Sequence, residues 1–531
     1  MKKRFPWIHL GKKTAPEVPY DTPIPLGNLS NGEFFHEQTP RERRLKKLVL
    51  EACDEKARHL GMDRRDFIAS TMGMATTLSV LNVAAGCSSS SGGKASGKLG
   101  KGDGGFVVPP DATVDPGAAD ALVGGNEFIL DLQTHHIEDE QHWRVNHPGQ
   151  TYAGETLAPF LTFYNCPDLM TDPIKCVGPD KYVQAVFLGS DTTVAVLSGF
   201  PGRICDDATM CDHPISNEDM VASRDRINKA AGSERMVQHC QVDPNDKWPL
   251  QEQAMEKISS MYGNRGWKVY PAWPGPDSGT GWWMDDPDIA FPFYEKTMAL
   301  GQPLVCSHKG VKIANFLEEF LDPKDVGPAA KQYPKISFVI YHSAVELGNS
   351  EGPYDENAPT SSLRGMDRLI RTVLDNGLAN KNVYAEMGTA WITQMNDPIA
   401  AQHYVGKALK YLGEDHLVWG SECVWFNSPQ PQIEAFRTLQ ISQEFQDTYG
   451  YPAITPALRA KIFGLSGAKL YGIDPQAKRN AVDTSKLAML KGDLDGELGG
   501  RRWMFEPLGG PRTRREFLNL WRLRKAQGGV G

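Results

Sequence analysis

Leu304-Val-Cys-Ser-His308 and Ile336-Ser-Phe-Val-Ile-Tyr-His342 decide the fold of this chain. Each is a short apolar run, rich in branched or aromatic residues, that ends on a histidine. Such runs of four to eight residues predict buried strands. Eight such apolar runs occur along the chain, two of which are those quoted above. The runs are Glu127–Gln133, Thr193–Ser198, Met236–Val242, Trp267–Pro271, Leu304–His308, Ile336–His342, Val383–Met387 and Leu417–Gly420.

Amphipathic patterns separate the runs and predict helices. These patterns are Glu218–Ala231, Leu250–Tyr262, Asp288–Leu300, Leu363–Asn376, Pro398–Leu412, Pro431–Phe445 and Pro456–Leu470. Eight strands that alternate with helical segments favour one (β/α)8 barrel over residues 126–475. An open doubly wound sheet is the alternative. It would carry a glycine-rich phosphate loop after the first strand, where this chain has Asp131-Leu-Gln-Thr-His-His136 instead.

Composition narrows the class of protein. The 531 residues are 40% hydrophobic and 23% charged, which excludes collagen, a long coiled coil and wholesale disorder. The formal net charge of −8 gives no basic field for nucleic acid. We therefore expect a globular protein with a small-molecule substrate and no nucleic-acid partner, either as a single chain or as a homodimer.

Polar side chains stand where a barrel places its chemistry, at the carboxyl ends of the strands. Gln133 and His135 end the first run, and their spacing of two puts both on one face of the strand. His308 and His342 end the fifth and sixth runs, and Glu422 follows the eighth. One histidine at a strand end is most often structural. Four strand ends with such residues indicate an active site.

These strand ends resemble the amidohydrolase superfamily, and in particular the amidohydrolase-related branch that includes aminocarboxymuconate-semialdehyde decarboxylase. Further matches are Glu234-Arg-Met-Val237, Val242-Asp-Pro244, Trp267-Lys-Val-Tyr-Pro271, Asn382-Val-Tyr384 and the closing segment Lys461–Gly472. The resemblance covers about 350 residues. It implies a barrel enzyme with one catalytic divalent metal ion, and we expect zinc before manganese.

The resemblance implies His135, His308 and Glu422 as metal ligands, with Gln133 as a weak fourth. The family has histidine where this chain has Gln133, and most often aspartate where it has Glu422. A metal with an open position lowers the pKa of bound water and polarises a carbonyl. His342 is interpreted as the general acid/base, and Glu422 shares proton transfer with ligation. His136 and His239 are second-tier candidates.

Aromatic residues after the strand ends predict an apolar substrate pocket. Trp273, Trp282, Trp283, Trp391 and Trp425 lie in the loops at this end of the barrel, although lid packing explains some of them equally well. Arg203, after the second strand, is the nearest cation for a substrate carboxylate.

The segment before the barrel predicts export. Residues 1–62 are polar and expected to be irregular. Arg64-Arg65 and the uncharged run that follows resemble a twin-arginine signal over residues 63–87, and Val83-Ala-Ala-Gly-Cys87 resembles a lipoprotein cleavage site. Residues 88–125 then form a flexible linker. We expect a periplasmic protein, or one anchored on the outer side of the membrane by a lipid on Cys87. Residues 476–531 form a basic tail.

Three functions fit these residues. The preferred one is a metal-dependent hydrolase of an ester, lactone or amide, because scavenging outside the cytosol most often means hydrolysis. A metal-dependent non-oxidative decarboxylase on the same scaffold is the alternative. The third is a periplasmic binding protein that lost its metal when histidine became Gln133.

Overall fold

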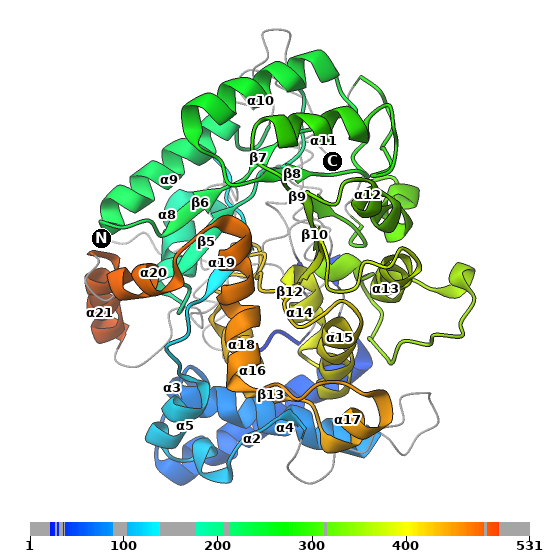
Figure 1. Cartoon of the computed structure of the whole chain (residues 1–531). Helices are drawn as coiled ribbons and strands as arrows, with labels where there is room; N and C mark the ends of the chain where they lie inside the picture. The colour runs from blue at the N-terminus through cyan, green and yellow to red at the C-terminus, as the bar shows by residue number, and fades with distance from the viewer. Residues whose placement is uncertain are drawn as a thin grey trace, which may run out of the picture.

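A computed structural model describes residues 22–26, 29–30, 35–36, 38–88, 104–138, 177–204, 210, 213–275, 277–312, 316–482 and 486–498. Eight parallel strands form the centre of the molecule (Figure 1). They are β4 (Leu130–Thr134), β5 (Val194–Leu197), β6 (Met236–Gln238) continued by β7 (Cys240–Gln241), β8 (Trp267–Val269), β9 (Leu304–His308), β10 (Ser337–Tyr341), β11 (Val383–Glu386) and β12 (Leu417–Val418). All eight strand predictions are confirmed, and so is the (β/α)8 fold.

The strands close into a barrel at two places. The third strand is divided, so that β6 pairs with β5 while β7 pairs with β8. On the other side the first and last strands meet, because Leu132 N–H donates to Trp419 O at 3.1 Å and His135 N–H donates to Cys423 O at 2.7 Å. Closure leaves the central sheet without an open edge.

The barrel interior is filled by side chains that alternate along the strands. Leu130 and Leu132 of β4, Val194 and Val196 of β5 and Val339 of β10 belong to one buried cluster inside the barrel. Their neighbours in sequence point outward against the helices. Burial on both faces explains why the strands are continuous apolar runs rather than alternating ones.

Helices surround the barrel. They are α8 (Pro179–Tyr182), α9 (Asn217–Ala231), α10 (Trp248–Tyr262), α11 (Ala290–Ala299), α12 (Val326–Gln332), α13 (Gly365–Asp375), α14 (Gly388–Gln394), α15 (Pro398–Tyr411), α16 (Gln430–Thr438), α18 (Pro456–Ala460) and α19 (Ser466–Tyr471). The predicted helix over 431–445 is wrong in its second half. The chain leaves α16 at Thr438, forms the short strand β13 (Leu439–Gln440), and restarts as α17 (Gln443–Tyr449), where the Ser442 hydroxyl accepts a hydrogen bond from Phe445 N–H.

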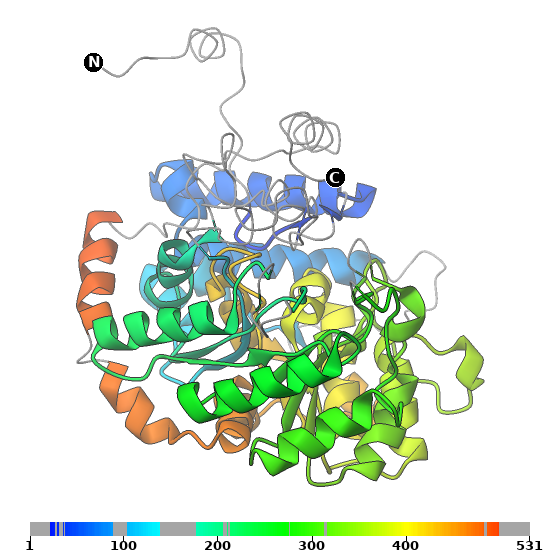
Figure 2. The ribbon, with the colours of Figure 1, turned by 90° about the horizontal axis from the view of Figure 1, so that it is seen from above.

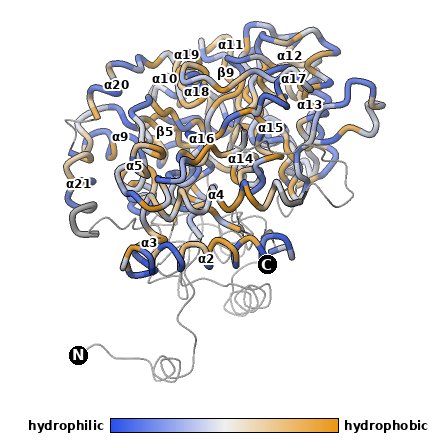
Figure 3. The backbone as a smooth tube through the Cα atoms, turned by 90° about the horizontal axis from the view of Figure 1, so that it is seen from below, coloured by the Kyte–Doolittle hydropathy of each residue, from blue (hydrophilic) through white to orange (hydrophobic). Residues whose placement is uncertain are grey.

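The segment before the barrel is folded in its described parts. It forms α2 (Pro40–Leu60), α3 (Arg64–Ile68), α4 (Thr71–Ser88), strand β3 (Gly105–Phe106) and α5 (Pro116–Val123), after the short pair β1 (Leu29–Ser30) and β2 (Phe35–His36). The expectations of an irregular segment up to residue 62 and of a flexible linker over 88–125 are therefore wrong where the structure describes them. Figures 2 and 3 show these helices along one side of the barrel.

The sequence of α2 explains why it is a helix. Thr39 and Glu42 form a capping box at its start, and Gly61 ends it in the left-handed conformation. Leu45, Val49 and Cys53 recur every four residues and are buried on one face.

After the barrel come α20 (Pro475–Val482) and α21 (Lys486–Leu498), and the basic cluster at 512–515 lies outside the described residues. No helix within the described part of the chain is long and apolar enough to cross a membrane.

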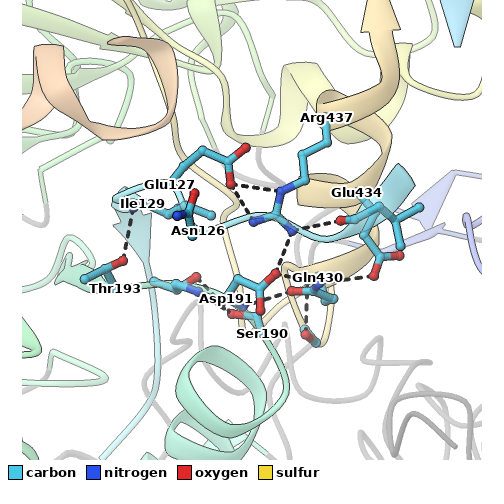
Figure 4. A network of polar contacts seen from close by, with 12 residues as sticks. Asn126, Glu127, Ile129, Ser190, Asp191, Thr193, Gln430, Glu434 and Arg437 are labelled. Carbon is cyan, nitrogen blue, oxygen red and sulfur yellow. Dashed lines mark hydrogen bonds and ion pairs between the residues drawn. The ribbon is translucent and has the colours of Figure 1, made fainter. Parts of the chain in front are cut away.

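An ionic network ties together the amino-terminal end of the barrel (Figure 4). Arg437 of α16 is 6% exposed, and its guanidinium lies 2.8 Å from Glu127 Oε2 and 2.6 Å from Asp191 Oδ2. The same group donates to Val123 O at 2.9 Å. Glu127 and Asp191 directly precede β4 and β5. The network therefore fixes the starts of two strands against one helix, at the barrel end that serves stability.

Candidate active site

The structure brings five predicted residues together at the carboxyl ends of the strands. Gln133 and His135 lie at the end of β4, His308 ends β9, His342 follows β10 and Glu422 follows β12. Each of the five is at most 3% exposed. Strand register places them, since His308 pairs with Tyr341 and the next residue is His342.

His135, Gln133 and Glu422 form one half of the site. Nδ1 of His135 lies 2.9 Å from the carbonyl oxygen of Ser198, so that nitrogen carries the hydrogen and Nε2 keeps a lone pair. Nε2 lies 3.3 Å from the amide nitrogen of Gln133, which also donates to Glu422 Oε1 at 3.3 Å. The Gln133 amide thus joins the imidazole to the carboxylate.

His308 and His342 form the other half. Nε2 of His308 donates to Val311 O at 2.6 Å, which leaves the lone pair on Nδ1. That Nδ1 lies 3.3 Å from Nε2 of His342. Because Thr389 N–H donates to Nδ1 of His342 at 3.3 Å, neutral His342 carries its hydrogen on Nε2. This N–H also lies 3.6 Å from Glu422 Oε1, so it points into the site.

Burial keeps the site histidines neutral. It lowers the pKa of His135 to about 3, with the Lys268 ammonium adding to the effect. Burial, then Lys268, also lowers the pKa of His308, and burial followed by His308 lowers the pKa of His342. Neutral imidazoles can bind a metal or donate one hydrogen bond without first losing a proton.

Glu386 is a site residue that the sequence analysis missed. It ends β11, is fully buried, and its Oε2 accepts a hydrogen bond from His342 N–H at 3.0 Å. Its carbonyl oxygen accepts from the Ser343 hydroxyl at 2.8 Å. Burial raises the pKa of Glu386 to about 8. A signal was present in the sequence, because this acid lies next to the last residue of the seventh apolar run, Val383–Met387.

Asp131 connects the first strand to the turn that carries Glu422. Its carboxylate accepts from the Ser421 hydroxyl at 2.5 Å and from Ser421 N–H at 3.0 Å. Burial raises the pKa of Asp131 to about 7. We assign Asp131 to positioning, since these bonds orient the backbone that leads into Glu422.

The backbone is strained where it presents the site. His342, Ser343 and Ala344 have φ angles of 58°, 49° and 57°, and Glu422 has a φ of 57°. Such left-handed conformations are unfavourable for residues other than glycine and persist where the surrounding structure imposes them. Beside them Gly310 has a φ of 79°, and a Cβ there would lie 2.2 Å from the Ala344 carbonyl, so only glycine fits.

A buried cation lies below the histidines. Nζ of Lys268 sits 3.9 Å from the ring centroid of Tyr270 and 4.0 Å from that of Tyr341. His239 lies in the same interior region, where its Nδ1 is 3.0 Å from the Ser198 hydroxyl. His136 points away from the barrel interior, toward Tyr182.

Of the five predicted tryptophans, two lie near the site. Trp425 stacks on His135 with ring centroids 5.8 Å apart. Trp273 packs against Phe316, whose ring lies 5.1 Å from that of His308.

The other three tryptophans are not stacked on the site histidines in the described part of the chain. Trp282 and Trp391 are buried in the main core, and Trp391 donates to Gln432 O, so their role as pocket residues stays a prediction. Trp283 lines a cavity of about 880 Å³ together with Gly310 and Ala344. Arg203 lies in the loop after β5, and its role stays a prediction.

The donor set is suited to a metal ion. Among the described residues, no three His, Cys, Asp or Glu side chains converge as a preformed metal site. The donor atoms of His135, His308 and Glu422 are instead linked through Gln133 and His342 in steps of 3.3–3.6 Å. Both histidines predicted as ligands, His135 and His308, hold the tautomer that ligation needs, and within the described chain Gln133 Oε1 is buried without a hydrogen-bond partner. The residues therefore fit a metal ion.

Comparison with known proteins agrees with this chemistry. Residues 223–473 match the family model described as Amidohydrolase. No curated protein matches the chain. This match supports an enzyme that is a metal-dependent hydrolase or decarboxylase.

Solved structures with similar folds have low identity to this chain. An uncharacterized TIM-barrel protein from Bordetella bronchiseptica is 14% identical with a TM-score of 0.41, covering 66% of this chain and 99% of its own. The 5-carboxyvanillate decarboxylase from Sphingomonas paucimobilis is 11% identical with a TM-score of 0.39, covering 65% and 99%. A manganese-bound dihydroxybenzoic acid decarboxylase from Polaromonas is 14% identical with a TM-score of 0.37, covering 65% and 97%. These TM-scores are below 0.5, and the likeness to the amidohydrolase family is carried by the match over residues 223–473, which comprise the barrel from β6 onward.

Proposed function

We propose that this barrel is a metal-dependent decarboxylase of a small carboxylic acid. The observation that carries the proposal is the tautomer of His342. Thr389 N–H occupies Nδ1, and Nε2–H therefore points into the site beside Glu422. A decarboxylase needs such a proton donor at the carbon that loses CO2.

His135, His308 and Glu422 would hold the metal ion, with Gln133 as a weaker oxygen ligand. When bound, a divalent ion polarises an oxygen of the substrate and neutralises developing negative charge. Zinc suits imidazole ligands, whereas manganese suits oxygen ligands such as Glu422 and Gln133.

The surroundings favour a flat, acidic substrate. Lys268 supplies a buried positive charge below the histidines. Trp425, Phe200 and Phe316 place aromatic rings around His135 and His308. Aromatic walls with one fixed cation bind planar anions better than flexible neutral molecules.

The reaction balances with the residues of the site. Nε2 of His342 transfers its proton to the substrate carbon that bears the carboxylate. The bond between that carbon and the carboxylate breaks, CO2 leaves, and the electron pair of the bond stays on the carbon skeleton. His342 then regains a proton from water. Glu386 holds the backbone of His342 in place during transfer.

Hydrolysis is the second candidate, and one observation favours it. Glu422 accepts hydrogen bonds and faces His342, as a general base that takes a proton from water would. The same residues serve both reactions. The preference for hydrolysis from the sequence rested on export, which stays a prediction.

Product analysis separates the two reactions. Purified protein loaded with zinc or manganese is incubated with a panel of aromatic carboxylic acids and a panel of esters, lactones and amides. We expect CO2 release from at least one acid, abolished by a chelator and restored by metal. Hydrolysis of neutral substrates without CO2 release would establish the second candidate. Metal binding with neither activity would favour a binding protein.

A further inference from the structure

The signal-like segment is built into the fold. α4 packs against α15, β3 contacts α15 and α16, and α5 contacts α16, while α2 and α3 pack on α4 (Figure 3). Leu78, Leu81 and Ala85 of α4 are at most 1% exposed. They belong to the same continuous core as the barrel helices.

One face of the barrel, formed by α15, has to be covered by another part of the chain. Helices α2 to α4 (residues 40–88) are called the cover below. Every residue from Pro398 to Leu409 of α15 is buried, which makes α15 a helix without a solvent-facing side. A helix that is buried around its whole circumference must be covered on both sides. α4 and β3 contact α15 from outside, and β3 pairs with β13.

Specific polar contacts fix the cover in place. Asn82 of α4 accepts from Phe106 N–H at 3.0 Å and donates to Phe106 O, so that its amide completes the edge of β3. Arg41 of α2 forms an ion pair of 3.0 Å with Asp397, the N-cap of α15. Thr71 donates to Asp120 of α5 at 2.7 Å. An apolar leader that packed on the barrel without specificity would not form these hydrogen bonds and this ion pair.

The twin-arginine-like motif itself is folded. Arg64 and Arg65 begin α3, where Asp63 caps the helix, and the next apolar residues, Phe67 and Ile68, are fully buried. The chain then turns tightly into α4, because a Cβ at Gly73 would lie 2.4 Å from Phe67 O. An export receptor that reads this motif would have to unfold it first.

We propose that residues 40–88 stay in the mature protein as a permanent cover of the α15 side of the barrel, and that the folded chain holds the signal-like motif in a helix with its apolar residues Phe67 and Ile68 buried. Export with cleavage before Cys87 predicts the opposite. Removal of residues 40–88 would expose the face of α15 that α4 covers and would take away the Asn82 amide that bonds Phe106 of β3. A barrel without residues 40–88 should therefore be less stable and prone to association.

The intact mass of the folded protein tests retention directly. The full chain is expressed in a bacterium with a working twin-arginine pathway, and folded monomers or oligomers are recovered from the cytosol and the periplasm. We expect the mass to include residues 40–88 in whichever compartment holds the protein. Folded protein that begins at or after Cys87 would overturn the proposal.

A cut chain tests whether the cover is bound. A protease site inserted within residues 89–103 allows cleavage after folding. We expect the amino-terminal fragment to stay with the barrel through gel filtration and to separate only in denaturant. A fragment that leaves while the Tm of the barrel is unchanged would contradict the proposal.

Two substitutions on one helix supply a matched comparison. Leu78→Asp puts a charge into the contact between α4 and the barrel, whereas Val83→Asp puts it on a side chain that is 66% exposed. We expect Leu78→Asp to lower the Tm by several degrees and Val83→Asp to leave it unchanged. Asn82→Ala, a milder change, should lower the Tm by less than Leu78→Asp. Equal Tm values for the native chain and the three variants would show that α4 does not cover the barrel.

Discussion

Thr389 N–H donates to Nδ1 of His342 across 3.3 Å, and this contact decides which nitrogen of the ring carries the proton. The Nε2–H of His342 then faces Nδ1 of His308 at 3.3 Å and Oε1 of Glu422 at 3.6 Å. A nitrogen that carries a hydrogen cannot ligate a metal at the same time. The relationship therefore separates His342 from the proposed metal ligands.

His342→Ala should keep the metal and lose turnover. We expect kcat to fall by roughly 10²–10⁴-fold, because a positioned general acid is lost, while metal content stays near that of the native chain. Metal analysis and kcat on the same preparation check this. His308→Ala is the comparison, and there metal and activity should fall together. Loss of metal in His342→Ala would instead make it a ligand.

The stability of the metal-free chain should be greatest near pH 6.5. Burial lowers the pKa of four histidines to about 3 or 4: His135, His136, His239 and His403. Below their unfolded pKa of about 6.5, each binds protons more readily when unfolded, so stability falls with falling pH by up to about 1.4 kcal/mol per unit and group.

The buried acids act in the other direction. Burial raises the pKa of Asp131 to about 7 and of Glu386 to about 8, so their stabilisation is complete below about pH 4 and is lost as the pH rises toward 8. Between about pH 4 and pH 6.5 the four histidines change the free energy of unfolding more than the two acids do, so stability rises with pH. Above pH 6.5 only the two acids still contribute, so stability falls as the pH rises. Urea unfolding from pH 5 to 8 in a chelator measures the profile. Glu386→Gln should flatten the part above pH 6.5, and an unchanged slope there would contradict the raised pKa.

Gln133→His should strengthen metal binding. The Gln133 amide nitrogen donates to Glu422 Oε1, so its oxygen must turn toward the ion before it can ligate. An imidazole at this position has a lone pair ready and is the better ligand for zinc. We expect a Kd lower by roughly tenfold or more in competition with a chelator dye. Gln133→Leu, which has no donor, should bind more weakly than the native chain. Equal affinities for all three proteins would remove residue 133 from the site.

Arg437→Met should destabilise the barrel without altering its chemistry. The change leaves Glu127 and Asp191 without the cation that joins them (Figure 4). Loss of one partner in a fully buried network costs about 3–5 kcal/mol, and we expect a smaller loss here because Glu127 and Asp191 are partly exposed and Asp191 keeps its contact with Lys491. Arg226→Met is the control, because its ion pair with Asp180 is exposed and contributes about 0–1 kcal/mol. Denaturant unfolding should separate the two variants, and kcat of the folded fraction should match the native value in both.

The sequence predicted the barrel because burial leaves a local signature. Apolar runs marked all eight strands, and the rule that chemistry lies at strand ends selected His135, His308, His342 and Glu422. The same rule missed Glu386 because the predicted strand ran on to Met387, one residue beyond the observed end. An error of one residue is enough to move an acid from a strand end to a strand interior.

Other features of the site depend on contacts between distant parts of the chain. The tautomers of His308 and His342 follow from Val311 O and Thr389 N–H, which no spacing in the sequence reveals. α4 shows the same limit. An uncharged, mildly apolar helix after two arginines looks alike in an export signal and in a buried cover. Only its contacts with α15 and β3 distinguish the two.

Lys268→Met tests both the substrate class and the electrostatics of the site. Methionine keeps most of the side-chain volume between Tyr270 and Tyr341 but removes the charge. If Lys268 attracts a substrate carboxylate, KM for an acidic substrate should rise by roughly tenfold or more, while KM for a neutral ester should not change. Because Lys268 also lowers the pKa of His135 and His308, both values should rise in the variant, which NMR titration of the metal-free chain can follow. Raised histidine pKa values with an unchanged KM for acids would show that Lys268 tunes the imidazoles and does not attract the substrate, and would weaken the case for decarboxylation over hydrolysis.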